Sequence, residues 1–198
     1  MVLSLDFLFR VATLLIFLGW WCYWLITERE AEKEKPKTMV PDIVRMQQQF
    51  QRWLLRLGQV VVVLQLLGLS LAVFPGKPFV SQLIGLIIVI VGVGISISAR
   101  KTLGSNWSHA VEYQVKKKQE LVTTGIYSVI RHPIYAGLCL AIIGGELVAQ
   151  SYGVFFGMAL LGIGYWQAKK EEALLLTHFG NAYKSYMKRT KMFLPYLW

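Results

Sequence analysis

The sequence has little cysteine, histidine or acidic side chain, and each shortage argues against a class of site. Its 198 residues include two cysteines and three histidines. Cys22 and Cys139 both lie in apolar runs, so neither a disulfide framework nor a zinc site is expected. His109 and His178 have no partner at metal-ligand spacing, and no metal site is predicted. Acidic residues number 11 against 21 lysines and arginines, which gives a net charge of +10.

Apolar residues are abundant, and they come in long runs. They make up 55% of the chain, against about 45–50% in a soluble domain by a count that includes glycine. A helix needs about 20 mostly apolar residues to cross about 30 Å of hydrocarbon. Residues 3–26, 54–74 and 79–99 qualify, and residues 133–167 are long enough for two crossings with a turn near Gln150 and Ser151. The sequence therefore predicts an all-α integral membrane protein with five transmembrane helices.

The first apolar run resembles a signal peptide only superficially. It is longer than a typical signal core, and the segment from Trp20 to Tyr23 offers no small-residue cleavage site. Aromatic residues at the end of such a run are typical of a membrane–water interface. We expect residues 3–26 to form a membrane span.

The basic residues are concentrated on one side of the predicted bilayer. Of the basic residues in the connections between spans, only Lys77 lies in the two connections that follow the second and fourth spans. Because cytoplasmic loops carry the excess of lysine and arginine, we expect the N-terminus outside and the C-terminus in the cytoplasm. The same distribution argues against a nucleic-acid partner. The basic residues follow the first, third and fifth spans: Arg29, Lys33, Lys35, Lys37, Arg45, Arg52, Arg100, Lys101, Lys116, Lys117, Lys118, Arg131, Lys169, Lys170, Lys184, Lys188, Arg189 and Lys191.

Arg131 and His132 occupy a position that suits either of two roles. Pro133 fits the first position of a helix, where its missing N–H costs nothing. The two side chains then sit at the positive N-terminal end of the fourth span, which favours an anion, and Tyr135 lies within the same turn. The alternative is that the three residues simply anchor the helix at the interface.

Glu171 and Glu172 follow the fifth span directly, and they also have two interpretations. They either form a solvated helix end with Lys169 and Lys170, or present carboxylates to the amino group or ribose of a cofactor. The surrounding sequence predicts a helix over residues 171–190, broken at Gly180.

Two further features lie within the predicted spans. Glu146 is an ionisable residue at membrane depth and hence a functional candidate, but it is near the outer turn and an interfacial location is favoured. Gly92 and Gly94 lack the strand–turn–helix context of a dinucleotide loop, which favours close helix packing.

The ordered motifs of the C-terminal half resemble the isoprenylcysteine carboxyl methyltransferases, within a wider group that includes phospholipid N-methyltransferases. The resemblance covers residues 103–195. The residues that carry it are Leu121-Val122-Thr123-Thr124-Gly125-Ile126-Tyr127, Arg131-His132-Pro133-Ile134-Tyr135-Ala136-Gly137, Glu171-Glu172, Phe179-Gly180, Tyr183, Tyr186 and Phe193-Leu194-Pro195.

The resemblance implies S-adenosylmethionine bound in a cytoplasm-facing pocket formed by the last two spans. It implies no dedicated catalytic residue, with positioning by Arg131, His132 and Tyr135. It divides the chain into three N-terminal spans (1–99) and a methyltransferase core (100–198). The cofactor-contacting positions that it implies are Leu121, Val122, Tyr127, His132, Pro133, Ile134, Tyr135, Glu171 and Glu172.

The methyl acceptor implied by the resemblance is the α-carboxylate of a prenylated cysteine. The pattern departs from the family at Gln119, often histidine, and at Gln167, which aligns with an arginine tied to the substrate. The alternatives are a phospholipid or small-lipid N-methyltransferase and a non-enzymatic membrane protein. The compact length is typical of a prokaryotic member in the cell membrane; a eukaryotic member would lie in the endoplasmic reticulum.

Overall fold

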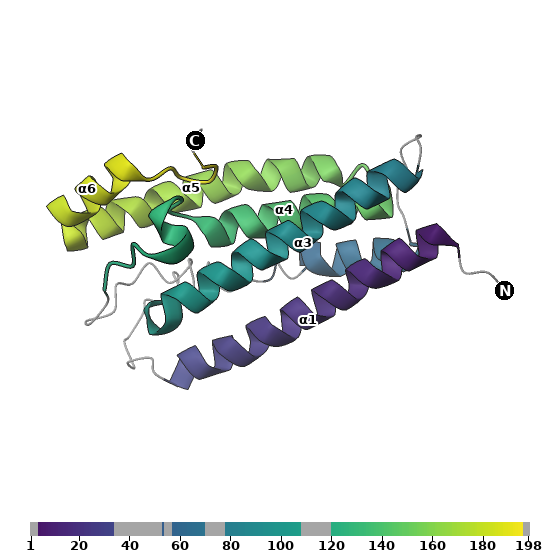
Figure 1. The fold of residues 1–198 in the computed structure, drawn as a ribbon, viewed down its shortest axis with the longest axis horizontal. Coiled ribbons are helices and arrows are strands. Elements are labelled where there is room, and N and C mark those ends of the chain that lie inside the picture. The colour runs from purple at the N-terminus through teal and green to yellow at the C-terminus, as the bar shows by residue number, and fades with distance from the viewer. Residues whose placement is uncertain (1–3, 34–52, 54–56, 70–77, 108–119, 196–198) are drawn as a thin grey trace.

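A bundle of helices makes up the part of the chain that the computed structural model describes, residues 4–33, 53, 57–69, 78–107 and 120–195 (Figure 1). Within these residues the regular structure is helical, so the all-α prediction is confirmed. The helices are α1 (Leu5–Lys33), an unlabelled helix over Leu57–Leu66, α3 (Pro78–Leu103), α4 (Pro133–Ala149), α5 (Val154–Phe179) and α6 (Asn181–Arg189), with short 3₁₀ turns η1 (Gly104–Asn106) and η2 (Gly125–Ser128).

Helix lengths bear on the membrane prediction. Helix α1, over Leu5–Arg29, and α3 are each long and apolar enough to cross a bilayer. The helix over Leu57–Leu66 and α4 are apolar but shorter. The number of crossings and the orientation of the chain stay predictions.

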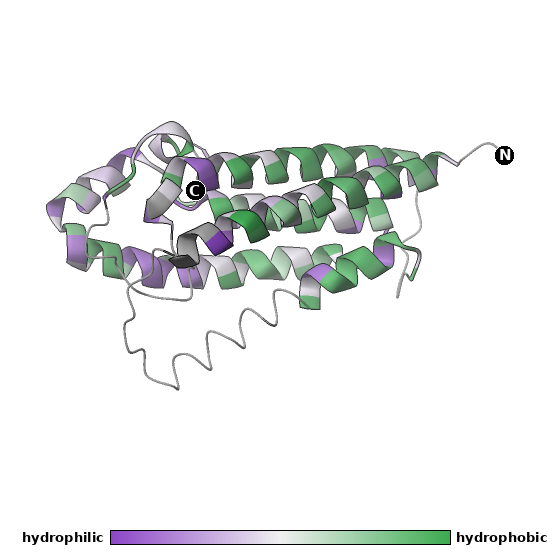
Figure 2. Ribbon diagram, turned by 90° about the horizontal axis from the view of Figure 1, so that it is seen from below, coloured by the Kyte–Doolittle hydropathy of each residue, from purple (hydrophilic) through white to green (hydrophobic). Residues whose placement is uncertain are grey.

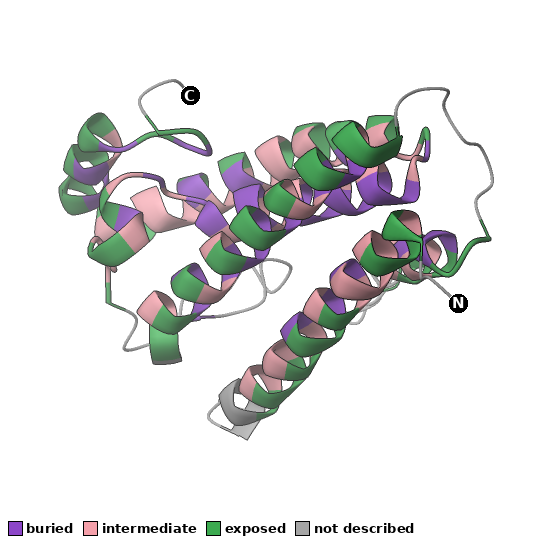
Figure 3. Cartoon of the chain, turned by 45° about the vertical axis from the view of Figure 1, so that its right-hand side comes forward, coloured by how far each residue is buried: buried purple, intermediate pink, exposed green. Residues whose placement is uncertain are grey.

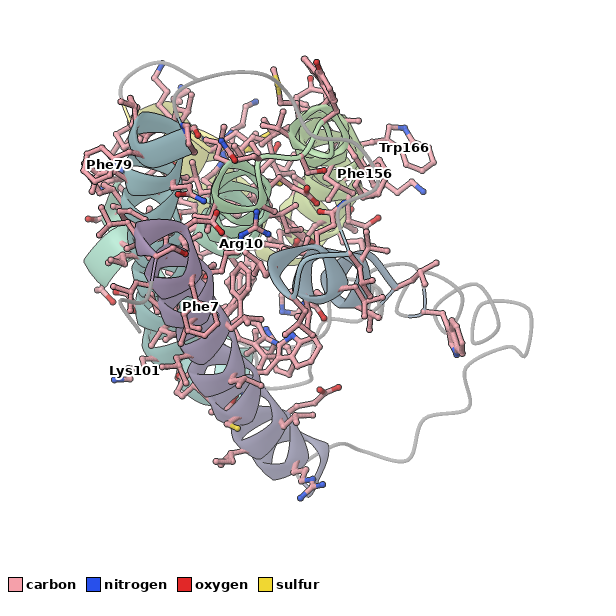
Figure 4. The ribbon with its side chains drawn as sticks, turned by 90° about the vertical axis from the view of Figure 1, so that its right-hand side faces the viewer. Phe7, Arg10, Phe79, Lys101, Phe156 and Trp166 are labelled. Atoms are coloured by element: carbon pink, nitrogen blue, oxygen red, sulfur yellow. The ribbon has the colours of Figure 1, made fainter. Side chains whose placement is uncertain are left out.

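The outer surface of the bundle is apolar along most of its length. Figure 2 shows hydrophobic ribbon over the long helices and hydrophilic ribbon gathered at the end that holds α6. In Figure 3 the buried residues concentrate on α4, while α1 and α3 expose much of their surface. The side chains of Phe79 and Trp166 point away from the bundle (Figure 4), and each is at least half exposed. A continuous exposed apolar surface of this kind fits lipid better than water, as expected for an integral membrane protein.

Glycines let α3 and α4 pack closely as antiparallel neighbours. A Cβ added at Gly85 would lie 2.7 Å from the Gly144 carbonyl oxygen, and one added at Gly92 would lie 2.7 Å from the Gly137 carbonyl oxygen. The backbones therefore approach as in small-residue packing of membrane helices. The prediction of a packing site is confirmed for Gly92, whereas a Cβ at Gly94 would meet no atom within 4 Å.

The turn between α4 and α5 and the break before α6 lie where the sequence predicted them. Gln150 ends α4 in the left-handed conformation, with φ of 55°. Helix α5 continues unbroken from the apolar segment through Glu171 and Glu172 to Phe179. Gly180, with φ of 54°, then separates α5 from α6, a conformation that glycine adopts without steric cost.

A polar network at the end of the bundle opposite α6 joins α1, α3 and α4. Asp6 accepts two hydrogen bonds from Arg10 Nε, at 3.0 and 3.2 Å, and Arg10 points into the interior (Figure 4), where Nη1 donates to the Gln65 carbonyl oxygen at 2.9 Å. The Gln82 amide donates to Asp6 and, at 3.2 Å, to the Val148 carbonyl oxygen.

Glu146 belongs to the same network and is only 2% exposed. With its amide nitrogen toward Glu146, Gln65 donates to Glu146 Oε1 at 3.0 Å and accepts from the Ser151 hydroxyl at 3.2 Å; the reverse orientation would set oxygen against oxygen. We refer to Asp6, Arg10, Gln65, Gln82, Glu146 and Ser151 as the distal cluster. Burial within this network, rather than exposure at the interface, accommodates Glu146.

Candidate functional site

The start of α4 is fixed by the C-terminal part of the chain. Lys191 N–H donates to the Val129 carbonyl oxygen at 3.0 Å, and Arg131 N–H donates to the Lys191 carbonyl oxygen at 2.8 Å. His132 N–H then donates to the Met192 carbonyl oxygen at 3.0 Å. These bonds leave His132 as the residue that caps α4, with Pro133 in the first turn, as the sequence predicted.

Arg131 links three segments of the chain rather than facing solvent. Its Nε donates to Glu172 Oε1 at 2.7 Å, and the two side chains are 9% and 3% exposed. Its Nη1 donates to the Thr190 carbonyl oxygen and, at 3.3 Å, to the Met187 carbonyl oxygen. A buried arginine is tolerated because its donors find a carboxylate and carbonyls. Arg131 thus positions Glu172 and the segment after α6.

His132 is buried between the two glutamates. Its Nδ1 lies 3.6 Å from Glu171 Oε2, and its Nε2 lies 3.4 Å from Glu172 Oε1. The second distance permits electrostatic attraction, but Nε2 makes no hydrogen bond to any described residue. The ring stacks on Tyr135 at a centroid distance of 5.7 Å. A buried imidazole nitrogen without a hydrogen bond is costly, so a ligand atom that bonded to it would recover free energy.

The charges of this region shift the titration of two groups. Burial alone would lower the pKa of His132, but the nearby carboxylates of Glu171 and Glu172 outweigh it and raise the pKa above its usual value. Burial would raise the pKa of Glu172, but His132 and Arg131 lower it. Both shifts favour an ionised Glu172 facing a protonated His132.

Glu171 forms the open side of the site. Its side chain is 38% exposed, in contrast to the buried Glu172, and its Oε2 accepts a hydrogen bond from the Tyr135 hydroxyl at 3.3 Å. We refer to Arg131, His132, Tyr135, Glu171 and Glu172 as the glutamate cluster. These five residues were the main site candidates in the sequence, and the structure brings them together where the start of α4 meets the C-terminal half of α5.

The other predicted site residues are buried or half-buried where the structure describes them. Leu121 and Val122 lie half-buried in the stretch before η2, and Ile134 lies half-buried in the first turn of α4. Pro133 is buried where α4 begins, and Gln167 is half-buried on α5, one turn before Glu171. Gln119 and His109 lie outside the described residues.

Tyr127 combines a predicted binding position with a structural role. It is buried in η2, and burial raises the pKa of its phenol well above the usual range. Its carbonyl oxygen accepts a 2.7 Å hydrogen bond from the Tyr186 hydroxyl on α6. Tyr127 therefore helps to hold α6 against the segment that leads into α4.

Residues of the C-terminal segment complete the site although they had no assigned role in the sequence. Tyr183 and Tyr186 form the buried face of α6, and their spacing of three residues on a helix was an available signal. Thr190 contributes a carbonyl oxygen to Arg131, and backbone contacts of this kind leave no trace in a sequence. Met192 and Phe193 pack against Ala136 and Ala168.

The arrangement suits a ligand that carries both charges. Glu171 and the Tyr135 hydroxyl present oxygen acceptors at the exposed rim, where an ammonium group or sugar hydroxyls could donate. His132 Nε2, when protonated, presents a donor to a carboxylate. The helix N-terminus adds a partial positive charge beside it. S-adenosylmethionine carries an amino group, a carboxylate and a ribose, so the residues present fit it.

Comparison with known protein families shows to which family the chain belongs. Residues 80–182, just over half of it, match the phospholipid methyltransferase family. The chain belongs to that family. The match runs from α3 to the first residues of α6 and so includes the whole glutamate cluster. It ends before Tyr183 and the segment that pairs with Val129–His132.

Within the phospholipid methyltransferase family, the chain is similar to protein-S-isoprenylcysteine O-methyltransferases. It is 31% identical to those of Mus musculus and Homo sapiens over 115 residues, 57% of this chain and 41% and 40% of theirs. It is 32% identical to that of Xenopus laevis over 118 residues, 59% of this chain and 41% of the other. The resemblance found in the sequence is confirmed. The chain matches about two fifths of the length of these relatives.

One solved structure has the same fold as this chain. The eukaryotic intramembrane Ras methyltransferase ICMT (isoprenylcysteine carboxyl methyltransferase), solved without a monobody, superposes with a TM-score of 0.58 at 20% identity. The superposition covers 94% of this chain and 68% of the other. It supports an intramembrane helical fold. These relatives are eukaryotic, so the expectation of a prokaryotic cell membrane stays a prediction that they do not support.

Proposed function

We propose that the protein is a membrane-embedded, S-adenosylmethionine-dependent methyltransferase that esterifies the α-carboxylate of a prenylated cysteine. The observation that carries the proposal is the glutamate cluster at the end of an apolar bundle, where buried His132 Nε2 makes no hydrogen bond to a described residue and the Glu171 carboxylate is partly exposed. Family membership and the similarity to isoprenylcysteine enzymes support the reaction type. In this proposal residues 1–99 supply three spans and residues 100–198 the methyltransferase core.

In this proposal the protein binds and orients its two substrates rather than attacking either one. When bound, S-adenosylmethionine supplies a methyl group on a sulfonium together with its own leaving group. Tyr135 and Glu171 would hold its amino or ribose groups, and His132 its carboxylate, with Leu121, Val122, Tyr127, Pro133 and Ile134 around it. Holding donor and acceptor in line can be worth effective molarities of about 10⁵–10⁸ M. No dedicated catalytic side chain is then required.

A membrane setting follows from the acceptor in this proposal. The prenyl tail would reach the site from the lipid phase, along the exposed apolar surface of the bundle, while the cofactor arrives from water. We propose five spans with the N-terminus outside, so that the glutamate cluster faces the cytoplasm. The basic residues near this end, among them Lys101 and Lys184, support that orientation.

A carboxylate acceptor is favoured over an amine because of the charges at the site. A carboxylate is already ionised and needs no base, whereas a protonated amine must first lose a proton. The imidazole of the glutamate cluster belongs to His132, and its pKa is raised above the usual value, which favours the protonated form over the form that could act as a base. The name of the matched family keeps a phospholipid amine as the second candidate. Gln167, in place of an arginine, is the position that we expect to influence this choice.

The acceptor is tested by offering both candidates in the same micelles. The full chain receives methyl-labelled S-adenosylmethionine with either N-acetyl-S-farnesylcysteine or phosphatidylethanolamine. We expect label in the prenylcysteine fraction, released as volatile methanol by alkali because an ester is formed. Label that stays in the lipid amine fraction would instead establish the N-methyltransferase. A Glu172→Gln variant, with the same lipid content, provides the background for both.

A further inference from the structure

Helix α6 has two faces of opposite character. Tyr183 and Tyr186 are buried against the bundle. The other side exposes Lys184, Lys188 and Arg189, and Lys191 is exposed just beyond the helix. From Ala173 to Trp198 the sequence contains no Asp or Glu. The exposed face is therefore positive with no acidic residue in its own segment to compensate it.

Backbone hydrogen bonds place Lys191, at the end of this basic face, level with the start of the apolar helix α4. Lys191 is bonded through its backbone to Val129 and Arg131, which immediately precede α4. Helix α4 is apolar from Pro133 onward. Lys191 thus lies beside the boundary between polar and apolar surface, and Leu194, three residues further, is 47% exposed.

Helix α5 marks the same level independently. Its Ala168 packs against Met192 and Phe193, so the segment after α6 reaches the height of Ala168. Close to this height Trp166 is exposed, and Lys170 Nζ lies 3.4 Å above its ring centroid. An exposed tryptophan with a neighbouring lysine is typical of the membrane interface. Two helices therefore place the C-terminal end of the basic face at headgroup depth.

We propose that Lys184, Lys188, Arg189 and Lys191 form a binding surface for the phosphate groups of anionic phospholipids in the leaflet that borders α6. The occupant is a lipid headgroup because the surface is positive, lies at headgroup depth and continues into exposed apolar surface at Leu194. Juxtamembrane basic clusters attract anionic lipids, and the attraction falls off within about a Debye length.

Lipid bound to this surface would stabilise the segment that completes the glutamate cluster. The segment from Thr190 to Met192 supplies the carbonyl oxygens that Arg131 and His132 N–H engage. A ligand that binds only the folded arrangement raises its stability by mass action. Anionic lipid should therefore raise the melting temperature of the protein without any cofactor present.

The test titrates short-chain lipids into the full chain in a neutral detergent and follows thermal unfolding. The probes are dioctanoyl-phosphatidylglycerol, dioctanoyl-phosphatidylcholine and inorganic phosphate at equal ionic strength. We expect a saturable rise in melting temperature with phosphatidylglycerol alone, lost in about 0.5 M salt. An equal response to phosphatidylcholine or to inorganic phosphate would overturn the proposal.

Two matched double variants locate the surface. Lys188→Gln with Lys191→Gln should weaken phosphatidylglycerol binding by about fivefold per residue removed. Arg29→Gln with Lys101→Gln removes two exposed cations from α1 and α3 and should leave binding unchanged. Equal losses in both would show general charge attraction and overturn the proposed surface. If the first variant is unstable, Lys184→Gln, in the first turn of α6, should still show the fivefold loss.

Because no cofactor is present in these titrations, their outcome is independent of the proposed methyl transfer. A protein that binds phosphatidylglycerol but transfers no methyl group would retain the lipid surface and lose only the proposed activity. A protein that transfers methyl groups without a lipid response would retain the proposed activity and lose only the lipid surface.

Discussion

Each end of the helical bundle holds an arginine–carboxylate pair and a buried glutamate, but the two clusters differ in how far their polar groups are satisfied. In the distal cluster, Gln65 and Ser151 hydrogen-bond with each other and Gln65 with Glu146, and Gln82 donates to Asp6 and Val148. In the glutamate cluster, His132 Nε2 makes no hydrogen bond to a described residue, and Glu171 is partly exposed.

The difference distinguishes a cluster that stabilises the fold from a cluster that can bind a ligand. Buried polar groups that satisfy one another stabilise a unique packing, and the distal cluster joins α1 to α3 and α4 in this way. A buried group left unpaired costs free energy, which is recovered when a ligand supplies the partner. Of the two clusters, only the glutamate cluster has that unrecovered cost, and all five of its residues lie inside the matched family region, whereas Asp6, Arg10 and Gln65 of the distal cluster lie outside it.

The largest expected effect compares the two arginines. Arg131→Met removes the partner of Glu172, which is 3% exposed, and should cost about 3–5 kcal/mol of stability. Arg10→Met removes a pair whose Asp6 side chain is 47% exposed and should cost less, about 1–3 kcal/mol. Thermal unfolding in detergent measures both. Equal losses would mean that burial does not distinguish the two pairs.

The next effect concerns α4, which contributes to both clusters. Gly92→Ala would force its Cβ against the Gly137 carbonyl oxygen and the Ala141 nitrogen and displace α4 from α3. Such overpacking costs about 1–3 kcal/mol. Gly94→Ala, two residues along the same helix, meets nothing within 4 Å and should not lower the melting temperature. Equal destabilisation by Gly94→Ala would contradict the packing explanation, because alanine favours a helix more than glycine does.

A pair of alanine substitutions should separate stability from binding. Glu146→Ala leaves Gln65 without its acceptor and should cost about 1–3 kcal/mol of stability, with unchanged adenosylhomocysteine binding in the folded fraction. Glu171→Ala should do the opposite, weakening binding about 5- to 150-fold with little change in unfolding. Calorimetry and thermal unfolding on the same preparations decide. Loss of binding in folded Glu146→Ala protein would make the distal cluster part of the site.

The smallest effect is the pH dependence of His132. Its pKa is raised in the folded protein, so its contribution to stability is complete below its unfolded pKa, near 6.5, and is lost as pH rises through the folded pKa. The melting temperature of the wild type relative to His132→Asn should fall as pH increases from 6 toward 9, by about 2–4 °C per kcal/mol lost. The lowered pKa of Glu172 keeps that residue ionised across this range. A difference that grows with pH would contradict the assignment.

Local signals in the sequence predicted much of this structure. Pro133 identified the start of α4, Gly180 the break before α6, and the polar pair at residues 150 and 151 the helical turn. Each works through its own backbone conformation, which one residue largely sets. The motif resemblance gathered His132, Tyr135 and Glu171 into one site, and the structure places them together.

Long-range contacts could not be predicted in the same way. Nothing in the sequence pairs Glu146 with Gln65, or Arg131 with the Thr190 carbonyl oxygen, because those contacts depend on how helices far apart in the chain pack. Gly92 and Gly94 look equivalent in sequence, but only Gly92 faces α4. These cases depend on the direction in which a residue points around its helix. Residues two positions apart, such as Gly92 and Gly94, differ in direction by about 200°.

The pairing of Arg131 with residues that come much later in the chain has a consequence for synthesis. Glu172 is 41 residues and Thr190 is 59 residues C-terminal to Arg131. At about 5–20 residues per second, the guanidinium waits roughly 3–12 s for its last partner to leave the ribosome. In the proposed five-span topology, α4 carries an uncompensated cation at its entrance to the bilayer during that interval, so its insertion would depend on the translocation machinery or on water to accommodate the charge until the C-terminal segment arrives.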